Sequence, residues 1–147
     1  MAKAIRKKVL SEKEKMINYI MQKGKKTVAE RIYADMLKIL EKKGFKESEQ
    51  SVKKALENIY PVIEVRPKRI GGAVYQVPIE VVGARRIALG LRWLLAAANQ
   101  KKGKSMANKL AEEIIQALDG QGNAVKKKED VHKMAEANKA FAHFARY

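Results

Sequence analysis

The chain has 147 residues, in which 32 Lys and Arg outnumber 16 Asp and Glu and leave a formal net charge of +16. An excess of this size opposes compaction unless anions neutralise it, so it indicates nucleic acid or an anionic membrane surface as the partner. Cysteine is absent, which excludes disulfides, thiolate metal sites and thiol nucleophiles, and the length with 46% hydrophobic residues predicts one folded domain with a real core.

The first ten residues are typical of a basic tail. Their cations are Lys3, Arg6, Lys7 and Lys8, and they contain neither a sustained apolar core nor a small-residue cleavage site. A clipped organellar presequence is the alternative that this composition leaves open. The longest apolar run, 93–98, is far shorter than the roughly 20 residues that span a bilayer, so no transmembrane helix is predicted. We expect residues 11–147 to form a single helical domain.

Two capping boxes predict the first two helices. Ser11 with Glu14, and Thr27 with Glu30, each place a hydroxyl three residues before a carboxylate, and this pattern satisfies the free N–H groups of a helix start. Apolar residues then recur at helical spacing until Gly24 and Gly44, which are natural helix ends. The predicted apolar stripe of the second helix is Val28, Ile32, Met36, Ile39 and Leu40.

A third helix and a β-hairpin follow. The helix is predicted to begin at Ser48 and to end at Pro61, because the residue before a proline is pushed out of the helical region. Within 62–82, two short β-like runs meet at Gly71 and Gly72, which can supply the positive φ angles of a tight primed turn. Prolines in both runs forbid a central strand, so we predict a two-stranded arm.

Three more helices are expected after the hairpin. The stretch 84–99 is the most apolar and is the predicted central helix, on which a lone Trp93 is more typical of packing than of base stacking. Ser105 is predicted to cap a helix that runs to Gly120. A polar turn over 122–128 then precedes a last helix capped by Asp130, in which Met134 and Phe141 share a face. The predicted fold is therefore mainly α, with six helices and a hairpin arm between the third and fourth.

No motif supports catalysis or a cofactor. The fragment 103–105 (Gly-Lys-Ser) resembles the end of a phosphate-binding loop, but Ala98 stands where that loop requires glycine, and the fragment joins two helices. His132 and His143 are predicted on one helix, roughly 16 Å apart by its rise, so they cannot share a metal and are expected to face RNA or solvent. The carboxylates form no acid–base pair. We predict a protein that is not an enzyme and binds no metal or cofactor.

The basic charge is concentrated in the predicted loops. Beside the tail, the basic segments are Lys23–Lys26, the arm cations Arg66, Lys68 and Arg69, Lys101, Lys102 and Lys104, and Lys126–Lys128. Several loops that hold phosphates at once suit a large folded RNA. A DNA-binding protein would carry base-reading side chains on a helix after a tight turn, and a membrane-surface or protein-binding module would carry one basic amphipathic helix. Both alternatives fit this pattern less well.

Several segments give the chain, from Lys13 to Tyr147, a close resemblance to a known family. They are Ile17-Asn-Tyr-Ile-Met21 with Gly24-Lys-Lys26, Ala55-Leu-Glu-Asn58, Gly71-Gly-Ala-Val-Tyr-Gln-Val-Pro78, Arg92-Trp93, Lys104-Ser-Met-Ala107 and Ala124 to His143. This set resembles the bacterial and organellar type of ribosomal protein seven of the small subunit. The resemblance implies a six-helix fold with a hairpin arm and a place in the small ribosomal subunit, in a bacterial cytoplasm, a plastid stroma or a mitochondrial matrix.

The resemblance also implies partners and contact residues. In that family the protein is a primary rRNA binder that nucleates assembly of the head (3′ major) domain. Its arm lies near the exit-site tRNA and the mRNA path, and proteins of the head and platform surround it. The family start is usually longer and richer in arginine, so the tail cations cannot be aligned. Carried onto matching positions, the expected rRNA contacts are Lys25, Lys26, Arg66, Lys68, Arg69, Arg85, Arg86, Arg92, Lys104, Lys109 and Lys126–Lys128.

Overall fold

The structure is a computed structural model that describes residues 9–146, so the tail cations Lys3, Arg6, Lys7 and Lys8 lie outside it. Within this range there are six α-helices, one two-stranded sheet and one 3₁₀ helix. The elements are α1 (Glu12–Ile20), α2 (Lys26–Lys42), α3 (Ser48–Ile59), β1 (Ile63–Ile70), β2 (Ala73–Glu80), α4 (Ala84–Gln100), α5 (Met106–Leu118), α6 (Asn123–Ala137) and the 3₁₀ helix η1 (Lys139–Arg146). The predicted fold class, mainly α with a hairpin between the third and fourth helices, is confirmed.

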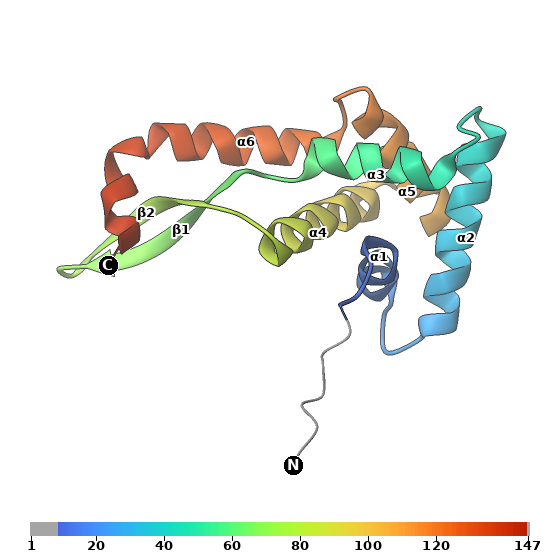
Figure 1. Ribbon diagram of the computed structural model, residues 1–147, viewed down its shortest axis with the longest axis horizontal. Helices are drawn as coiled ribbons and strands as arrows, with labels where there is room; N and C mark the ends of the chain where they lie inside the picture. The colour runs from blue at the N-terminus through green and yellow to red at the C-terminus, as the bar shows by residue number, and fades with distance from the viewer. Residues whose placement is uncertain (1–8, 147) are drawn as a thin grey trace, which may run out of the picture.

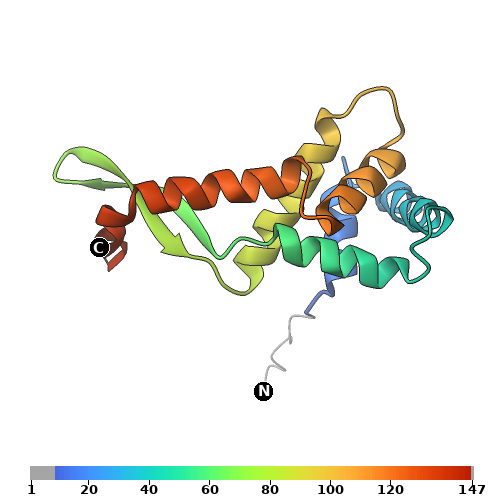
Figure 2. The same cartoon turned by 90° about the horizontal axis from the view of Figure 1, so that it is seen from above.

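The molecule is elongated, with a helical bundle at one end and the hairpin arm at the other (Figure 1). Helices α1 to α5 form the bundle, and α6 runs from the bundle along the arm, where η1 turns back onto β2 (Figures 1 and 2). The arm therefore does not stand alone, which agrees with the marginal stability of an isolated hairpin in water.

The core of the bundle is organised by two helices. The α4 helix, which was predicted to be central, packs against α1, α3, α5 and α6, and α5 packs against α2, α3, α4 and α6. Their inward side chains, Leu91, Leu94, Leu110 and Ile114, are fully buried. Between them, α4 and α5 contact every other α-helix of the described chain, so they position the elements that carry the basic residues.

The first capping box is confirmed and the second is wrong. Ser11 accepts a hydrogen bond from the Glu14 amide, and the Glu14 carboxylate accepts one from the Ser11 amide, at 3.2 and 3.0 Å. The α2 helix begins at Lys26, so Thr27 lies inside it, and the residue before the helix caps no N–H with its side chain. Four members of the predicted stripe are confirmed, because Met36 and Leu40 are fully buried and Ile32 and Ile39 pack against the core, whereas Val28 is 44% exposed. Ala29 and Tyr33, which the prediction did not include, are also buried.

The last α-helix begins seven residues before the predicted Asp130. Its cap comes from α5: Glu113 is fully buried, and its Oε1 accepts a hydrogen bond from the Ala124 amide at 2.9 Å. Gly122, with φ of +97°, leaves room for this carboxylate, because a Cβ there would lie 2.9 Å from Oε1. Lys126–Lys128 therefore lie on a helix and not in a turn. A cap supplied by another helix has no local signature in the sequence.

The end of the chain also differs from the prediction. The α6 helix ends at Ala137, and the Asn138 side chain donates to the Met134 carbonyl at 2.8 Å. Met134 is 52% exposed, whereas Phe141 lies on η1 with its ring centroid 5.2 Å from that of Tyr75 on the arm. The predicted shared face of Met134 and Phe141 is wrong, because Phe141 packs on an element that the sequence pattern does not connect with it.

Gly90 on α4 generates the first testable prediction. A Cβ at this position would lie 2.2 Å from Cδ1 of Tyr60, which is 4% exposed. In an open helix, Gly→Ala stabilises by about 1 kcal/mol, but here overpacking should dominate and Gly90→Ala should lower the free energy of unfolding by about 1–3 kcal/mol. Thermal and urea unfolding followed by circular dichroism measure this effect.

The matched control is the same substitution in a Tyr60→Leu background, which removes the ring. There Gly90→Ala should be neutral or stabilising. A stabilising effect of Gly90→Ala in the native background would contradict the contact.

Candidate nucleic-acid interface

The arm divides its three cations between two faces. In the antiparallel register Arg66 is opposite Val77, Lys68 is opposite Tyr75, and Arg69 is opposite Val74. The turn lies at Gly71 and Gly72, whose φ angles are +59° and +86°. Because side chains alternate along a strand, Arg66 and Lys68 share the face of Tyr75 and Val77, and Arg69 projects from the opposite, exposed face.

A buried carboxylate organises the base of the arm. Glu64 is 6% exposed and accepts from Arg66 Nε at 2.6 Å through Oε1 and from Arg85 at 3.2 Å through Oε2. One acid thus joins β1 to the start of α4 and leaves a net positive charge, since two guanidinium groups share a single carboxylate. Both arginine side chains keep about half of their surface exposed, at 49% and 43%. Their outer N–H groups are available to a phosphate.

Lys68 has a structural role that the sequence did not indicate. Its Nζ donates to the carbonyls of Phe144 and Ala145, at 3.3 and 3.1 Å, near the end of η1. Beside it, the Tyr75 ring lies 5.2 and 5.0 Å from the rings of Phe141 and Phe144. A cation at a helix C-terminus satisfies carbonyls that lack partners, so Lys68 and Tyr75 fasten η1 to the arm.

The arginines of α4 also differ in their surroundings. Arg86 donates to the Pro61 carbonyl at 3.1 Å, and its guanidinium lies 5.6 Å from the centroid of the Tyr60 ring, so it is held inside the junction of arm and bundle. Arg85 and Arg92 are seven residues apart, hence on one exposed helix face, and Arg92 lies 6.0 Å from the Tyr19 ring centroid. This face continues the cationic surface that starts at Arg66.

The loop after α4 pairs most of its lysines. Lys101 is only 18% exposed and lies 3.4 Å from Glu113 and 3.7 Å from Glu112. Lys104 also pairs with Glu112, and this hydrogen bond lowers the pKa of the Glu112 carboxyl. Lys102 is exposed with no ion pair to the described residues, and Lys109 on α5 is half-buried. Lys25 and Lys26, at the start of α2, are exposed.

The side chains of the three consecutive lysines of α6 point in different directions around the helix. Lys128 donates to the Asn58 carbonyl at 3.0 Å, and the Asn58 side chain donates to the Ala117 carbonyl at 2.9 Å. Lys126 and Lys127 are exposed. One lysine of this run therefore joins α6 to α3, and two remain for a partner.

The two histidines do not lie on one helix, which corrects the sequence prediction. His132 on α6 accepts from the Val62 amide through Nε2 at 3.2 Å, so it ties α6 to the base of the arm instead of facing solvent. Burial, and next the charge of Lys128, lower the pKa of His132 below its usual 6.5. His143 is exposed on η1, and its ring lies 4.1 Å from that of Phe144.

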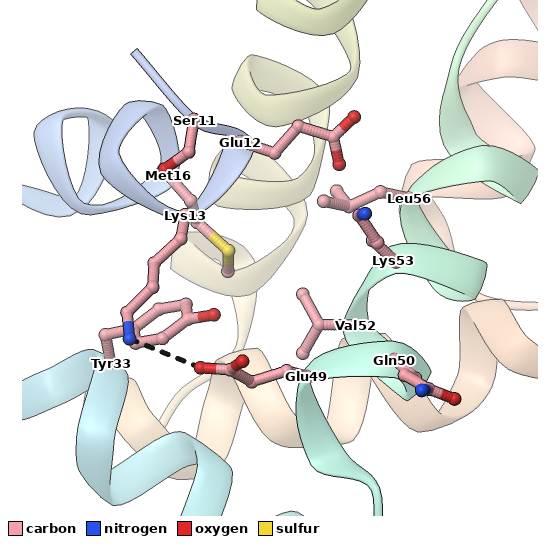
Figure 3. A pocket seen from close by; sticks show the side chains of 10 residues that line it. All are labelled: Ser11, Glu12, Lys13, Met16, Tyr33, Glu49, Gln50, Val52, Lys53 and Leu56. Atoms are coloured by element: carbon pink, nitrogen blue, oxygen red, sulfur yellow. Dashed lines mark hydrogen bonds and ion pairs between the residues drawn. The ribbon is translucent and has the colours of Figure 1, made fainter.

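A cavity of about 470 Å³ between α1, α2 and α3 has a different character (Figure 3). Lys13 reaches across it to Glu49 at 3.2 Å and lies 5.5 Å from the centroid of the Tyr33 ring. Burial, with a smaller effect of Glu49, raises the pKa of Tyr33 to about 12. Two acids, Glu12 and Glu49, and two lysines, Lys13 and Lys53, line this cavity, and Lys13 is paired with Glu49, so the cavity has no excess of positive charge for a phosphate.

Residues 9–146 offer neither a metal site nor a membrane span. In this range no group of three or more His, Asp or Glu side chains is placed to hold a metal ion. Over the same residues, every helix is too short or too polar to cross a bilayer. The charged groups in excess on the described surface are amines and guanidinium groups.

Sequence reasoning missed the groups that hold these cations in place. Glu64, Glu113 and Tyr75 are each close in space to residues that are distant in the chain. A partial signal existed for Glu64, because it is two residues from Arg66 on a strand and so shares its face. No comparable signal indicated Glu113.

Comparison with known proteins shows extensive similarity. A model of the family described as Ribosomal protein S7p/S5e matches residues 3–139. The protein named small ribosomal subunit protein uS7 of Thermotoga maritima is 54% identical over 130 residues, which cover 88% of this chain and 84% of that protein. The proteins of the same name from Thermosipho melanesiensis and Marinobacter nauticus are 52% and 54% identical, again over 88% of this chain and over 84% and 83% of their own lengths.

The His132 contact predicts a pH-dependent opening at the base of the arm. Only the neutral imidazole can accept from the Val62 amide, and the lowered pKa means that protonation disfavours the folded arrangement. The stability of this contact is therefore present above the ordinary histidine pKa of about 6.5 and is lost as the pH falls below it. Hydrogen exchange of the Val62 amide, expressed as a protection factor, should fall between about pH 7 and pH 5.

The matched control is His132→Gln, whose amide oxygen can accept the same hydrogen bond but does not titrate. Its protection factor should be flat over this range. A pH-dependent step that persisted in His132→Gln would assign the effect to another group.

Proposed function

We propose that this chain, which belongs to the Ribosomal protein S7p/S5e family, is a primary binder of the 3′ major domain of the rRNA. As a member of that family it is an rRNA-binding structural constituent of the small ribosomal subunit, which acts in translation and not as an enzyme. In this proposal its binding orders the RNA segments of the head and so nucleates assembly of that domain.

The observation that supports this proposal is the distribution of exposed cations over separate elements. The exposed cations that no ion pair to a described acid holds are Lys25 and Lys26 at the start of α2, Arg69 on the arm, Arg92 on α4 and Lys127 on α6. Each can neutralise a phosphate and release counterions. Because these elements lie far apart along the molecule, such contacts suit several segments of a folded RNA better than one short duplex.

In this proposal the arm lies near the exit-site tRNA and the mRNA path. It projects from the bundle, and its tip at Gly71 and Gly72 is exposed (Figure 1). Glycine lets a backbone approach a ligand closely, and Arg69 supplies a cation beside that tip. Neighbouring ribosomal proteins of the head and platform are the proposed protein partners.

The cations that are proposed to contact rRNA differ in their roles in the fold. Arg66 and Arg85 share Glu64, Arg86 holds Pro61, Lys68 holds η1, and Lys101, Lys104 and Lys128 have intramolecular partners. A substitution that neutralises any of these residues would both remove an RNA contact and loosen the structure, so a loss of binding would not be assigned to one cause. The paired residues remain proposed contacts through their exposed N–H groups, but they are poor choices for a test.

Arg69→Gln provides the cleaner test. We expect the variant to keep the thermal unfolding midpoint, to bind an rRNA fragment of the 3′ major domain more weakly, and to reduce the slope of log K against log salt by about 1, as the loss of one phosphate contact requires. Filter binding across a salt series measures both effects. The control is Lys38→Gln on α2, which removes an exposed cation from a face outside the proposed contacts.

The same series with duplex DNA and with anionic vesicles tests the partner itself. The rRNA fragment should bind far more tightly than either of them at physiological salt. Equal affinity for duplex DNA of the same length would contradict the proposed function, and so would identical slopes for Arg69→Gln and the unchanged chain.

A further inference from the structure

A groove between α4 and α6 is lined by no residue of the arm. Its volume is about 420 Å³, and its α4 side presents Trp93 beside the small residues Ala96 and Ala97. Its α6 side presents Lys126 and Lys127, one turn after the start of that helix. Trp93 is half-buried and packs against the core, so its ring is held in place while it lines the groove.

The polar side chains that line this groove have no hydrogen-bond or ion-pair partner inside the described part of the protein. Neither Lys126 nor Lys127 makes an ion pair there, in contrast to Lys128, which binds the Asn58 carbonyl. The Trp93 indole N–H and the side-chain amides of Gln100 and Asn123 likewise have no hydrogen bond to residues 9–146. An immobilised aromatic ring thus meets two amides and two cations whose polar groups have no hydrogen bond or ion pair to residues 9–146.

We propose that this groove receives an unpaired nucleotide of the rRNA, an inference that rests on the proposed function. The base lies against the Trp93 indole, and the alanines leave room for its flat ring. Lys126 and Lys127 contact the flanking phosphates. Gln100 and Asn123 offer both donors and acceptors to the base edge, which is free only in an unpaired nucleotide.

Charge and shape favour this occupant over a peptide or a duplex. Two lysines face one acid, Asp130, so the groove is net positive and an apolar helix would bury amines without partners. A duplex keeps its bases stacked and presents no ring face to Trp93. A single nucleotide combines the anion and the aromatic face that this groove can bind.

The chain contains one tryptophan, so its fluorescence reports on the groove directly. Titration of the full chain with single-stranded oligoadenylate and oligouridylate of about eight nucleotides should quench Trp93 emission saturably, because bases stack on aromatic rings. The duplex of these two strands should quench it far less. Lys126→Gln with Lys127→Gln should weaken the apparent affinity about tenfold or more, since two phosphate contacts are lost.

The control is Lys38→Gln with Lys42→Gln on α2, which removes the same charge from exposed positions away from the groove. It should leave quenching by single strands unchanged. Quenching that is absent, that is equal for duplex and single strands, or that falls equally in both double variants would overturn the proposal.

A second measurement uses the rRNA fragment and substitutions of the ring. Trp93→Phe keeps an aromatic face and should retain most of the affinity, whereas Trp93→Leu should lose about tenfold, as expected for one lost stacking contact. Unfolding curves show whether each variant is folded, and if Trp93→Leu is not, the fluorescence of the unsubstituted chain decides. A chain that binds the rRNA fragment without any change in Trp93 emission refutes the groove and leaves the proposed function intact. Failure to bind the fragment at all refutes the proposed function instead.

Discussion

The Glu113 carboxylate fixes the geometry on which the rest of the structure depends. It is fully buried, it caps α6 through the Ala124 amide, and Lys101 at 3.4 Å balances its charge. A buried carboxylate without such partners would be strongly destabilising. With them, it sets the residue at which α6 begins, and thereby the positions at which that helix meets α3, the base of the arm and the groove beside α4.

The arm shows why that position matters. A two-stranded ribbon needs support, and here α6 and η1 provide it through the His132 acceptor, the Lys68 donor and the aromatic cluster around Tyr75. Support of this kind places Arg69 and the glycine turn at a defined distance from the bundle. A rigid frame lowers the entropy cost of binding, so cations on several elements can engage a folded RNA together.

The sequence predicted what is determined locally. The Ser11 box, the helix that ends before Pro61 and the Gly71-Gly72 turn each depend on residues a few positions apart, and each agrees with the structure. The start of α2 was predicted wrongly because the Thr27 pattern forms no cap there. The start of α6 and the partner of Phe141 were predicted wrongly because they depend on Glu113 of α5 and on the Tyr75 ring of the arm, which are tertiary contacts. The candidate site was anticipated as a set of cations. Their division into structural and exposed members, such as Lys128 against Lys127, required knowledge of neighbours distant in the chain.

The most direct test of this account is hydrogen exchange on Glu113→Ala, read element by element. If Glu113 positions α6 and α6 supports the arm, protection should fall first over 123–137 and then over 63–80, before it falls in α2. Glu112→Ala, which loses the ion pairs to Lys104 and Lys101 but keeps the Glu113 cap, is the control and should leave both segments protected. The account would be contradicted if the arm kept its protection while α6 frayed, or if Glu112→Ala produced the same pattern.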